Sequence, residues 1–311
     1  MDDDYTGKRL GFLCSRIDDP RRIQLREGRF LKAYHERNTI DDDAIEIGHE
    51  LTKLRRIGNT DVADALMVFQ RPAMYSVEYT HDREYPLHPR VPLPKPRIPD
   101  RSFATIVRDR RSRRHFDRRA IVADQLSALL FCAAGESGHL PTGSKPEVSL
   151  RTIPSGGALH PTRVFVAVLQ AGDFARGLYH YDVPDHELEF IKPLSDPDIE
   201  ALFAAFPIHP DTVDLSECAA IFFLSTKFWR SRAKYGPRGY RYCLQEVGAA
   251  CQNLSLAAGA LDLAHVVLGG FYDDEVHRFL EIDGVDHAVI TTIAVGCAAA
   301  QSRGGREHVE F

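Results

Sequence analysis

One helical stretch in the second half of the sequence constrains the fold more than any other feature. From Tyr240 to Leu261, apolar residues recur every three or four positions, which is the spacing of one helix face. They are Leu244, Val247, Ala250, Cys251, Leu254, Ala257, Ala258 and Leu261. The small residues Gly248, Ala249, Ser255 and Gly259 widen this face and allow another backbone to approach closely. A helix with so little polar surface is normally buried in a large core or at a subunit interface, so we expect it at the centre of the fold.

The residues just before this helix are basic and aromatic. The segment from Phe228 to Tyr240 is broken by Gly236 and Pro237, so we expect a functional loop held by a rigid scaffold. It contains Lys234 and Tyr235, whose reference pKa values of about 10 make either a poor base at neutral pH. Crowding by arginines and loss of water would favour neutral lysine, and positive charge would favour tyrosinate. The loop therefore either generates a base, or packs Tyr235 and leaves Lys234 in solvent.

The rest of the second half mixes helices and strands. Apolar segments predict strands at residues 164–169, 178–182, 188–191, 219–224, 264–268 and 289–295. Helical spacing and start signals predict helices at 102–108, 124–134, 196–206 and 273–280. The second and third strands are joined by Val183–His186 and read as a hairpin. Because helices and strands do not alternate strictly, an α+β layered fold is favoured over a doubly wound one.

The first part of the chain has a different character. Mixed charge with apolar residues at helical spacing predicts helices around residues 21–37, 42–56 and 61–70. A proline-rich segment at 86–99 should be an extended, stiff connector. We therefore expect two parts, a helical region with its connector at 1–96 and a larger domain at 97–311.

Composition excludes several classes of function. The net charge of −5 argues against a general nucleic-acid binder. No apolar run is long enough to span a bilayer, and the acidic start of the chain is unlike a signal peptide. The six cysteines are scattered without a Cys-x-x-Cys pair, which indicates reduced thiols and a cytoplasmic location. The 14 histidines show no metal-ligand spacing, so no metal site is expected.

Three short motifs are candidates for ligand binding. The run Arg110-Arg111-Ser112-x-Arg114 combines guanidinium groups with a hydroxyl, which suits phosphate oxygens, but it could equally be a solvated basic turn. The run Pro154-Ser155-Gly156-Gly157 precedes a strand and could lie flat against a ring or simply turn the chain. Gly269-Gly270 ends another apolar strand and has the same two interpretations. Dinucleotide and phosphate-loop glycine motifs, His-Glu-x-x-His and Gly-x-Ser-x-Gly are absent.

In this order the motifs resemble those of the nitroreductase-fold flavoproteins, and more closely those of the SagB/McbC-type azoline dehydrogenases. The resemblance extends from about Ser102 to Gly296 and includes Tyr240-Arg241-Tyr242 and Gln252-Asn253-Leu254. It implies a nitroreductase-like fold, with an antiparallel-rich sheet flanked by helices. Enzymes of this type use FMN to oxidise thiazoline and oxazoline rings in ribosomally made peptides to thiazoles and oxazoles.

The resemblance also implies roles for individual residues. The FMN phosphate and ribityl chain would be held by Arg110, Arg111, Ser112 and Arg114, with Arg303 or Arg306 completing the phosphate site. The isoalloxazine ring would be lined from the partner subunit of a homodimer by Pro154, Ser155, Gly156 and Gly157. Gly269 and Gly270 would sit near the reactive edge of the flavin, and Lys234-Tyr235 would be the catalytic pair.

Two departures from the family pattern affect the expected substrate. Ala233 stands where a tryptophan is usual, and Gly248-Ala249 where a Gly-His pair is common. The leading interpretation is an FMN-dependent dehydrogenase of an azoline-bearing peptide or peptide-like metabolite, with oxygen as electron acceptor and a cyclodehydratase complex as a candidate partner. The alternatives are an NAD(P)H-dependent nitro- or quinone reductase, and a non-catalytic flavin-binding scaffold subunit of a peptide-modifying complex. The N-terminal region would brace the dimer or hold a leader peptide.

Overall fold

The structure is a computed structural model that describes residues 48–53, 84–141, 147–170 and 172–299. The chain divides into two compact units, residues 1–55 and 56–311. In the first unit, residues 48–51 are helical, within one of the predicted helices. The helices expected around 21–37 and 61–70 lie outside the described residues, and the boundary expected after residue 96 stays a prediction.

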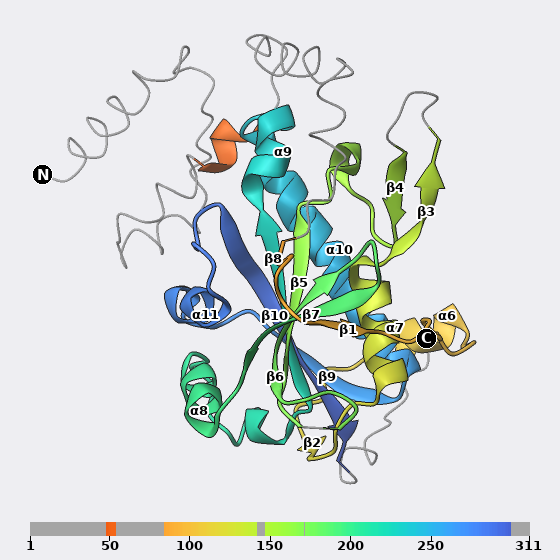
Figure 1. The fold of residues 1–311 in the computed structure, drawn as a ribbon, viewed down its shortest axis with the longest axis vertical. Helices are drawn as coiled ribbons and strands as arrows, with labels where there is room; N and C mark the ends of the chain where they lie inside the picture. Colours follow the sequence, from red (N-terminus) through yellow and green to blue (C-terminus); the bar gives the residue numbers. More distant parts are fainter. Residues whose placement is uncertain (1–47, 54–83, 142–146, 171, 300–311) are drawn as a thin grey trace, which may run out of the picture. The chain divides into compact units, whose positions relative to one another are not determined.

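An eight-stranded sheet forms the centre of the second unit (Figure 1). Its strand order is β1-β7-β6-β5-β8-β10-β2, and β9 also pairs with β10. The strands are β1 Arg90–Pro92, β2 Phe116–Asp117, β5 Thr162–Val168, β6 Gly177–Asp182, β7 Glu187–Pro193, β8 Ala220–Lys227, β9 Leu263–Leu268 and β10 His287–Ala298. Every pairing in the sheet is antiparallel. The predicted strands and the β6–β7 hairpin are therefore confirmed.

Helices cover both faces of this sheet. They are α6 Phe103–Asp109, α7 Ala123–Ala134, α8 Asp196–Ala204, α9 Phe228–Tyr235, α10 Arg238–Ala260 and α11 Asp273–Leu280. Because strand side chains alternate between faces, Val164 and Val166 of β5 pack with α7 and α10, whereas Phe165 and Ala167 pack with α8 and α11. Figure 1 shows these two helix pairs on opposite sides of the sheet. The predicted α+β fold, with an antiparallel sheet flanked by helices, is confirmed.

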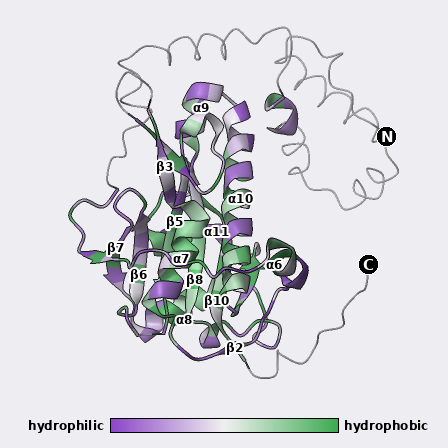
Figure 2. Ribbon diagram, turned by 90° about the vertical axis from the view of Figure 1, so that its right-hand side faces the viewer, coloured by the Kyte–Doolittle hydropathy of each residue, from purple (hydrophilic) through white to green (hydrophobic). Residues whose placement is uncertain are grey.

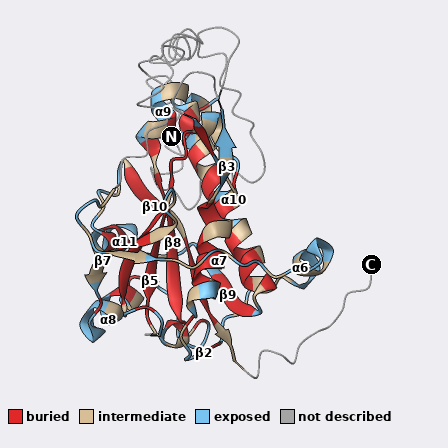
Figure 3. Cartoon of the chain, turned by 45° about the vertical axis from the view of Figure 1, so that its right-hand side comes forward, coloured by how far each residue is buried: buried red, intermediate tan, exposed pale blue. Residues whose placement is uncertain are grey.

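Hydrophobic residues gather along these packed elements, and the same elements are the most deeply buried (Figures 2 and 3). Strand β8 is buried from Ala220 to Thr226. Helix α6 contrasts with it, because it has no buried residue and exposes Phe103 and Val107. The core that positions the other elements is therefore formed by the sheet together with α7 and α10 on one face and α8 and α11 on the other.

The long helix α10 is buried along one side only. Cys243, Ala250 and Leu254 face the core, whereas Gln245 and Gln252 on the opposite side are exposed. Apart from the adjacent backbone of α10 itself, nothing lies within 4 Å of the position that a Cβ would take at Gly248. The expected helix is confirmed, but it begins at Arg238 rather than Tyr240, and one strip of its small residues is uncovered in the single chain.

The prediction of a loop before this helix is wrong for the first eight residues, which form α9. The run Phe228–Tyr235 contains no glycine or proline, and these helix-breaking residues arrive only at Gly236-Pro237. Gly236 takes a φ of 54°, which a residue with a side chain rarely adopts, and it ends the helix. Lys234 and Tyr235 therefore occupy the last turn of a short helix and not a free loop.

Several short strands were not predicted from the sequence. The hairpin of β3 Glu136–Leu140 and β4 Val148–Arg151 lies between the predicted helix at 124–134 and the predicted strand at 164–169, where no element was predicted. Strand β1 lies within the proline-rich connector and pairs with β7 at the edge of the sheet. Edge strands tolerate proline because one side of their backbone needs no partner. The prolines around β1 predicted a connector, so local composition did not reveal the strand.

Close packing between α9 and α10 depends on Gly239. A Cβ at Gly239 would lie 2.6 Å from the carbonyl carbon and oxygen of Ser231, both backbone atoms. We expect Gly239→Ala to lower the free energy of unfolding by about 1–3 kcal/mol, because the two helices must move apart. Urea unfolding would measure this, with Gly138→Ala as control, since nothing lies within 4 Å of a Cβ there. An equal effect of the two substitutions would contradict this packing account.

Candidate active site

The last turn of α9 meets a glycine turn that lies far from it in the sequence. A Cβ built on Gly157 would lie 2.4 Å from the hydroxyl oxygen of Tyr235 and 3.0 Å from Nζ of Lys234. The polar ends of both side chains therefore reach the short 3₁₀ turn Gly156–Ala158. The structure brings together Lys234, Tyr235 and the Pro154–Gly157 segment, which the sequence suggested as separate motifs.

The glycine turn has an unusual backbone. Gly157, Ala158 and His160 have φ values of 65°, 54° and 47°, so two residues with side chains adopt the left-handed region. Such conformations carry strain and persist only where surrounding contacts impose them. Part of the support comes from α9, where Nε of Arg230 donates to the carbonyl of Leu159 at 2.8 Å. The turn is therefore held in a conformation that it would not adopt alone.

Gly157→Ala tests the contact between the turn and the pair. The added methyl group would overlap the Tyr235 hydroxyl, and alanine would also be strained at a φ of 65°. We expect turnover to fall by about 10²-fold, the cost of displacing a reacting group by about 1 Å. Steady-state kinetics with a parallel thermal unfolding scan would measure this. Unchanged turnover would mean that the contact with Gly157 does not matter for the chemistry.

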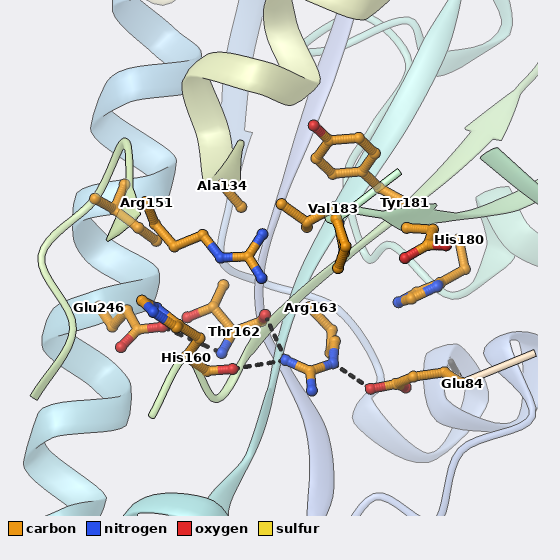
Figure 4. A pocket seen from close by; sticks show the side chains of 13 residues that line it. Glu84, Ala134, Arg151, His160, Thr162, Arg163, His180, Tyr181, Val183 and Glu246 are labelled. Carbon is orange, nitrogen blue, oxygen red and sulfur yellow. Dashed lines mark hydrogen bonds and ion pairs between the residues drawn. The ribbon is translucent and has the colours of Figure 1, made fainter. Parts of the chain in front are cut away.

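A small polar pocket is lined by His160 and Thr162, which follow the turn in sequence (Figure 4). It has a volume of about 40 Å³ and is lined by Glu84, Ala134, Arg151, Ile153, His160, Thr162, Arg163, His180, Tyr181, Asp182, Val183, Pro184 and Glu246. Strands β5 and β6 pair only from Phe165 to Val168 on β5, although β5 begins at Thr162. The two strands therefore part at this end, and polar side chains fill the opening.

Burial and charge set the protonation states around the pocket. Burial, reinforced by the nearby Arg151, lowers the pKa of His160 to about 3, so its imidazole is neutral at physiological pH. Burial also lowers the pKa of Arg151 to about 10, which leaves it charged. Burial opposes ionisation of Glu84, but Arg163, His180 and Lys227 hold its pKa well below the usual range. Burial raises the pKa of Glu246. The pocket thus combines charges of both signs.

A second cluster lies at the other end of the sheet. The backbone N–H of Arg113 donates to the carbonyl of His265 on β9 at 2.9 Å, which anchors the segment Arg110–Arg114. Nη1 of Arg111 donates to the carbonyls of Arg108 and Arg110 and so caps α6. Within the described ranges, none of the four arginines of this segment forms an ion pair. A cationic cluster without acidic partners suits an anionic group such as a phosphate.

The glycine pair expected near the flavin follows the same strand. Gly269 and Gly270 come directly after β9, are exposed, and have no heavy atom within 4 Å of a Cβ position. Four residues separate Gly269 from His265, which corresponds to about 13 Å along a strand. The open backbone at Gly269-Gly270 fits the flat ring of FMN, and guanidinium groups without an ion pair among the described residues fit its phosphate. Arg303 and Arg306 lie outside the described residues.

The two clusters do not meet within one chain. His265 is in register with Val295, and Val295 with Ala220 at the start of β8. Helix α9 begins after Lys227 at the end of β8, seven residues further and therefore about 23 Å along the strand. The structure thus groups Lys234, Tyr235 and Gly157 at one end of the sheet and the arginines at the other.

Sequence reasoning missed Glu246 and Arg151 as parts of the site. Glu246 is 3% exposed and lies on α10 among buried apolar residues, so a carboxylate on the apolar face was the available signal. Arg151 gave no such signal, because its strand β4 was not predicted. Across the part of the chain that the structure describes, there is no cluster of three or more metal-ligating side chains and no helix of the length and apolarity needed to cross a membrane.

Comparisons with known proteins identify the family. The model of the nitroreductase family matches residues 107–297. A nitroreductase-named protein of Methanocaldococcus jannaschii is 28% identical over 187 residues, covering 60% of this chain and 88% of that protein. The microcin B17-processing protein McbC of Escherichia coli is 31% identical over 140 residues, covering 43% of this chain and 49% of McbC.

A solved structure shares the fold. A nitroreductase-named structure from Anabaena variabilis superposes with a TM-score of 0.60 at 23% identity, covering 80% of this chain and 45% of that one. The chain therefore spans about half the length of McbC and less than half of the Anabaena chain. The resemblance stated from the motifs is confirmed at the level of the family and of McbC as a relative. The chain belongs to the nitroreductase family.

Proposed function

We propose that this protein is an FMN-dependent dehydrogenase that oxidises a thiazoline or oxazoline ring in a peptide or peptide-like metabolite to the aromatic azole. The observation that carries the proposal is the meeting of Lys234 and Tyr235 with Gly157 at one polar site. The relationship to McbC, which is named for processing microcin B17, supports a peptide substrate. Oxygen is the proposed final electron acceptor.

The chemistry requires a base beside the substrate ring. Aromatising an azoline removes a proton from one ring carbon and a hydride from its neighbour. FMN, when bound, supplies the acceptor for the hydride. Tyr235 or Lys234 takes the proton, and the other residue of the pair tunes the pKa of the base. Arg230, Arg232 and Arg238 add positive charge around the pair.

Two copies of the chain would complete each site in this proposal. Arg110, Ser112, Arg114, Gly269 and Gly270 would hold FMN in one copy, and the Pro154–Gly157 turn with Lys234 and Tyr235 would come from the other. The about 23 Å along the strands between the arginine cluster and the start of α9 supports this arrangement for the arginines, whereas Gly269 and Gly270 lie at an intermediate level. The arrangement is also supported by the uncovered strip of α10 around Gly248, which allows close approach of another backbone.

Anaerobic mixing experiments test the proposed reaction. The FMN-loaded protein would be mixed with a thiazoline-containing peptide, and separately with NADPH, while the absorbance of the oxidised flavin is followed. Bleaching by the thiazoline peptide with formation of thiazole is the expected result. Bleaching by NADPH alone, with no reaction of the peptide, would instead favour a nitro- or quinone reductase.

The proposed partner is a cyclodehydratase that makes the azoline. Co-purification of the chain with such an enzyme, encoded beside a precursor peptide, would support this assembly. A purely scaffolding role would be favoured if the protein bound FMN, joined the complex and promoted ring formation equally well without Lys234 and Tyr235. The domain at residues 1–96 is proposed to brace the dimer.

A further inference from the structure

Glu246 is a buried acid on an otherwise apolar helix face. It is 3% exposed, and its neighbours on the buried side of α10 include Cys243, Val247 and Ala250. Burying a carboxylate is unfavourable unless hydrogen bonds and charges compensate for the lost water. The position of Glu246 therefore points to a role that an apolar residue would not fill.

The hydrogen bonds of Glu246 reach both ends of the glycine turn. Its Oε1 accepts from the backbone N–H of Thr162 at 3.3 Å, just after the turn. The hydroxyl of Ser155, just before the turn, donates to the same carboxylate. Ser155 Oγ in turn accepts from the backbone N–H of His160 at 2.9 Å. One side chain on α10 thus fixes the start and the end of the segment 155–162.

The segment between these two anchors is the one that contacts the proposed base. It contains the three positive φ values at Gly157, Ala158 and His160, so it requires contacts from outside to keep its shape. The same segment carries the site where Tyr235 and Lys234 reach Gly157. A shift of this turn would therefore change the positions of the Lys234 and Tyr235 side chains.

We propose that Glu246 is a positioning residue, which holds the Ser155–Thr162 turn against Lys234 and Tyr235 from inside the fold. It does not touch the reacting atoms and acts through the turn. The inference rests on the proposed function for its effect on turnover, but the clamp on the turn is independent of the substrate. Burial raises the pKa of Glu246, and Arg163 and the bonds from Ser155 and Thr162 oppose this rise.

Peptide-resolved hydrogen exchange tests the clamp directly in the full-length, FMN-loaded protein. Glu246→Leu is expected to speed exchange in residues 155–162 by about 10- to 100-fold, because the hydrogen bonds that anchor both ends of the segment are lost. Ser155→Ala removes one anchor without altering α10 and should speed exchange in the same segment. Glu246→Gln keeps an acceptor oxygen and should restore most of the protection.

The matched control is Ser127→Ala. Ser127 is a fully buried residue of α7 whose hydroxyl donates to the carbonyl of Pro94 at 2.6 Å and contacts Nε2 of His186 at 2.8 Å. Losing these bonds should leave exchange at 155–162 unchanged. Equal exchange in the wild type, Glu246→Leu and Ser155→Ala would overturn the proposal, and so would an equal rise in Ser127→Ala.

Kinetics supply a readout that a general loss of stability would not give. Glu246→Leu should lower kcat by about 10-fold or more, as expected for a displaced base. FMN should still bind through its proposed phosphate ligands, which are distant from the turn in the sheet, and Glu246→Gln should recover kcat. Faster exchange with unchanged kcat would overturn the positioning role. If no azoline is oxidised by the wild type, the proposed function fails, whereas the exchange result still decides whether Glu246 clamps the turn.

Discussion

Lys234→Ala and Tyr235→Phe are each expected to cut turnover by about 10²- to 10⁴-fold while FMN stays bound. This is the usual contribution of a general base, and both polar ends reach the glycine turn at which the substrate ring would be presented. FMN should remain because its proposed phosphate ligands lie at the far end of the sheet. Single-turnover kinetics measure the chemical step, and the flavin absorbance of the purified variants measures retention.

A matched control separates this effect from a general change in charge. Lys192 lies on β7 and pairs with Glu281 at 2.7 Å, away from the glycine turn. Lys192→Ala should leave turnover within a factor of about two, because exposed ion pairs contribute little. A double variant of Lys234 and Tyr235 with normal activity would remove both residues from the mechanism.

The protein is expected to lose several kcal/mol of stability between pH 7 and pH 5. Burial, the largest cause in each case, lowers the pKa of His160 and His287 to about 3 and that of His265 to about 4. In the unfolded chain these histidines titrate at their ordinary value of 6.5. As the pH falls below 6.5, the unfolded state binds protons that the folded state does not bind, so stability falls with pH.

The size of this loss of stability follows from how far the pH lies below 6.5, the pKa of the histidines in the unfolded chain. At about 1.4 kcal/mol per pH unit, each histidine contributes a loss of about 2 kcal/mol by pH 5. Glu246 and Asp182, whose pKa values are raised by burial, offset part of the loss, because their folded forms bind a proton more readily. The remaining loss is a large fraction of the about 5–15 kcal/mol that stabilises a typical domain.

Urea unfolding at a series of pH values measures this loss. The free energy of unfolding should fall from pH 6.5 towards pH 5. His265→Leu should make this fall shallower by the contribution of about one proton, which is about 1.4 kcal/mol per pH unit. An exposed histidine provides the control, since His209 lies on the surface and its replacement by Gln should leave the slope unchanged. A stability that is level or rises towards pH 5 would contradict the burial of these three imidazoles.

The sequence predicted those parts of the fold whose pattern is local. Strand β8 begins with a continuous apolar run at 220–224, and α11 carries acidic residues at its start, so both were found. The β3–β4 hairpin was missed because β3, which contains Gly138 and His139, lacks apolar alternation, and β4 has only four residues; both strands are fixed by pairing across the hairpin. Strand β1 escaped notice for a similar reason, since it is defined by its partner β7 and not by its composition.

The residues of the candidate site could be predicted from the sequence, but their arrangement in space could not. Lys234, Tyr235 and Gly157 were singled out by type and by resemblance, yet no spacing in the sequence indicates that they touch. Their contact depends on β5 and β8 pairing side by side and on α9 turning back over the start of β5. Glu246 could have been suspected as an acid in an apolar stripe, but its partners Ser155 and Thr162 became visible only in the fold.

The most direct test of the account is the flavin content of the purified protein together with its mass in solution. Size-exclusion chromatography with light scattering and absorbance detection measures both in one experiment, after incubation with FMN. The account predicts a yellow dimer with one FMN per chain, which loses its flavin when Arg110 and Arg114 are replaced by alanine. A colourless protein that does not take up FMN, or a flavin-binding species that remains a single copy, would contradict it.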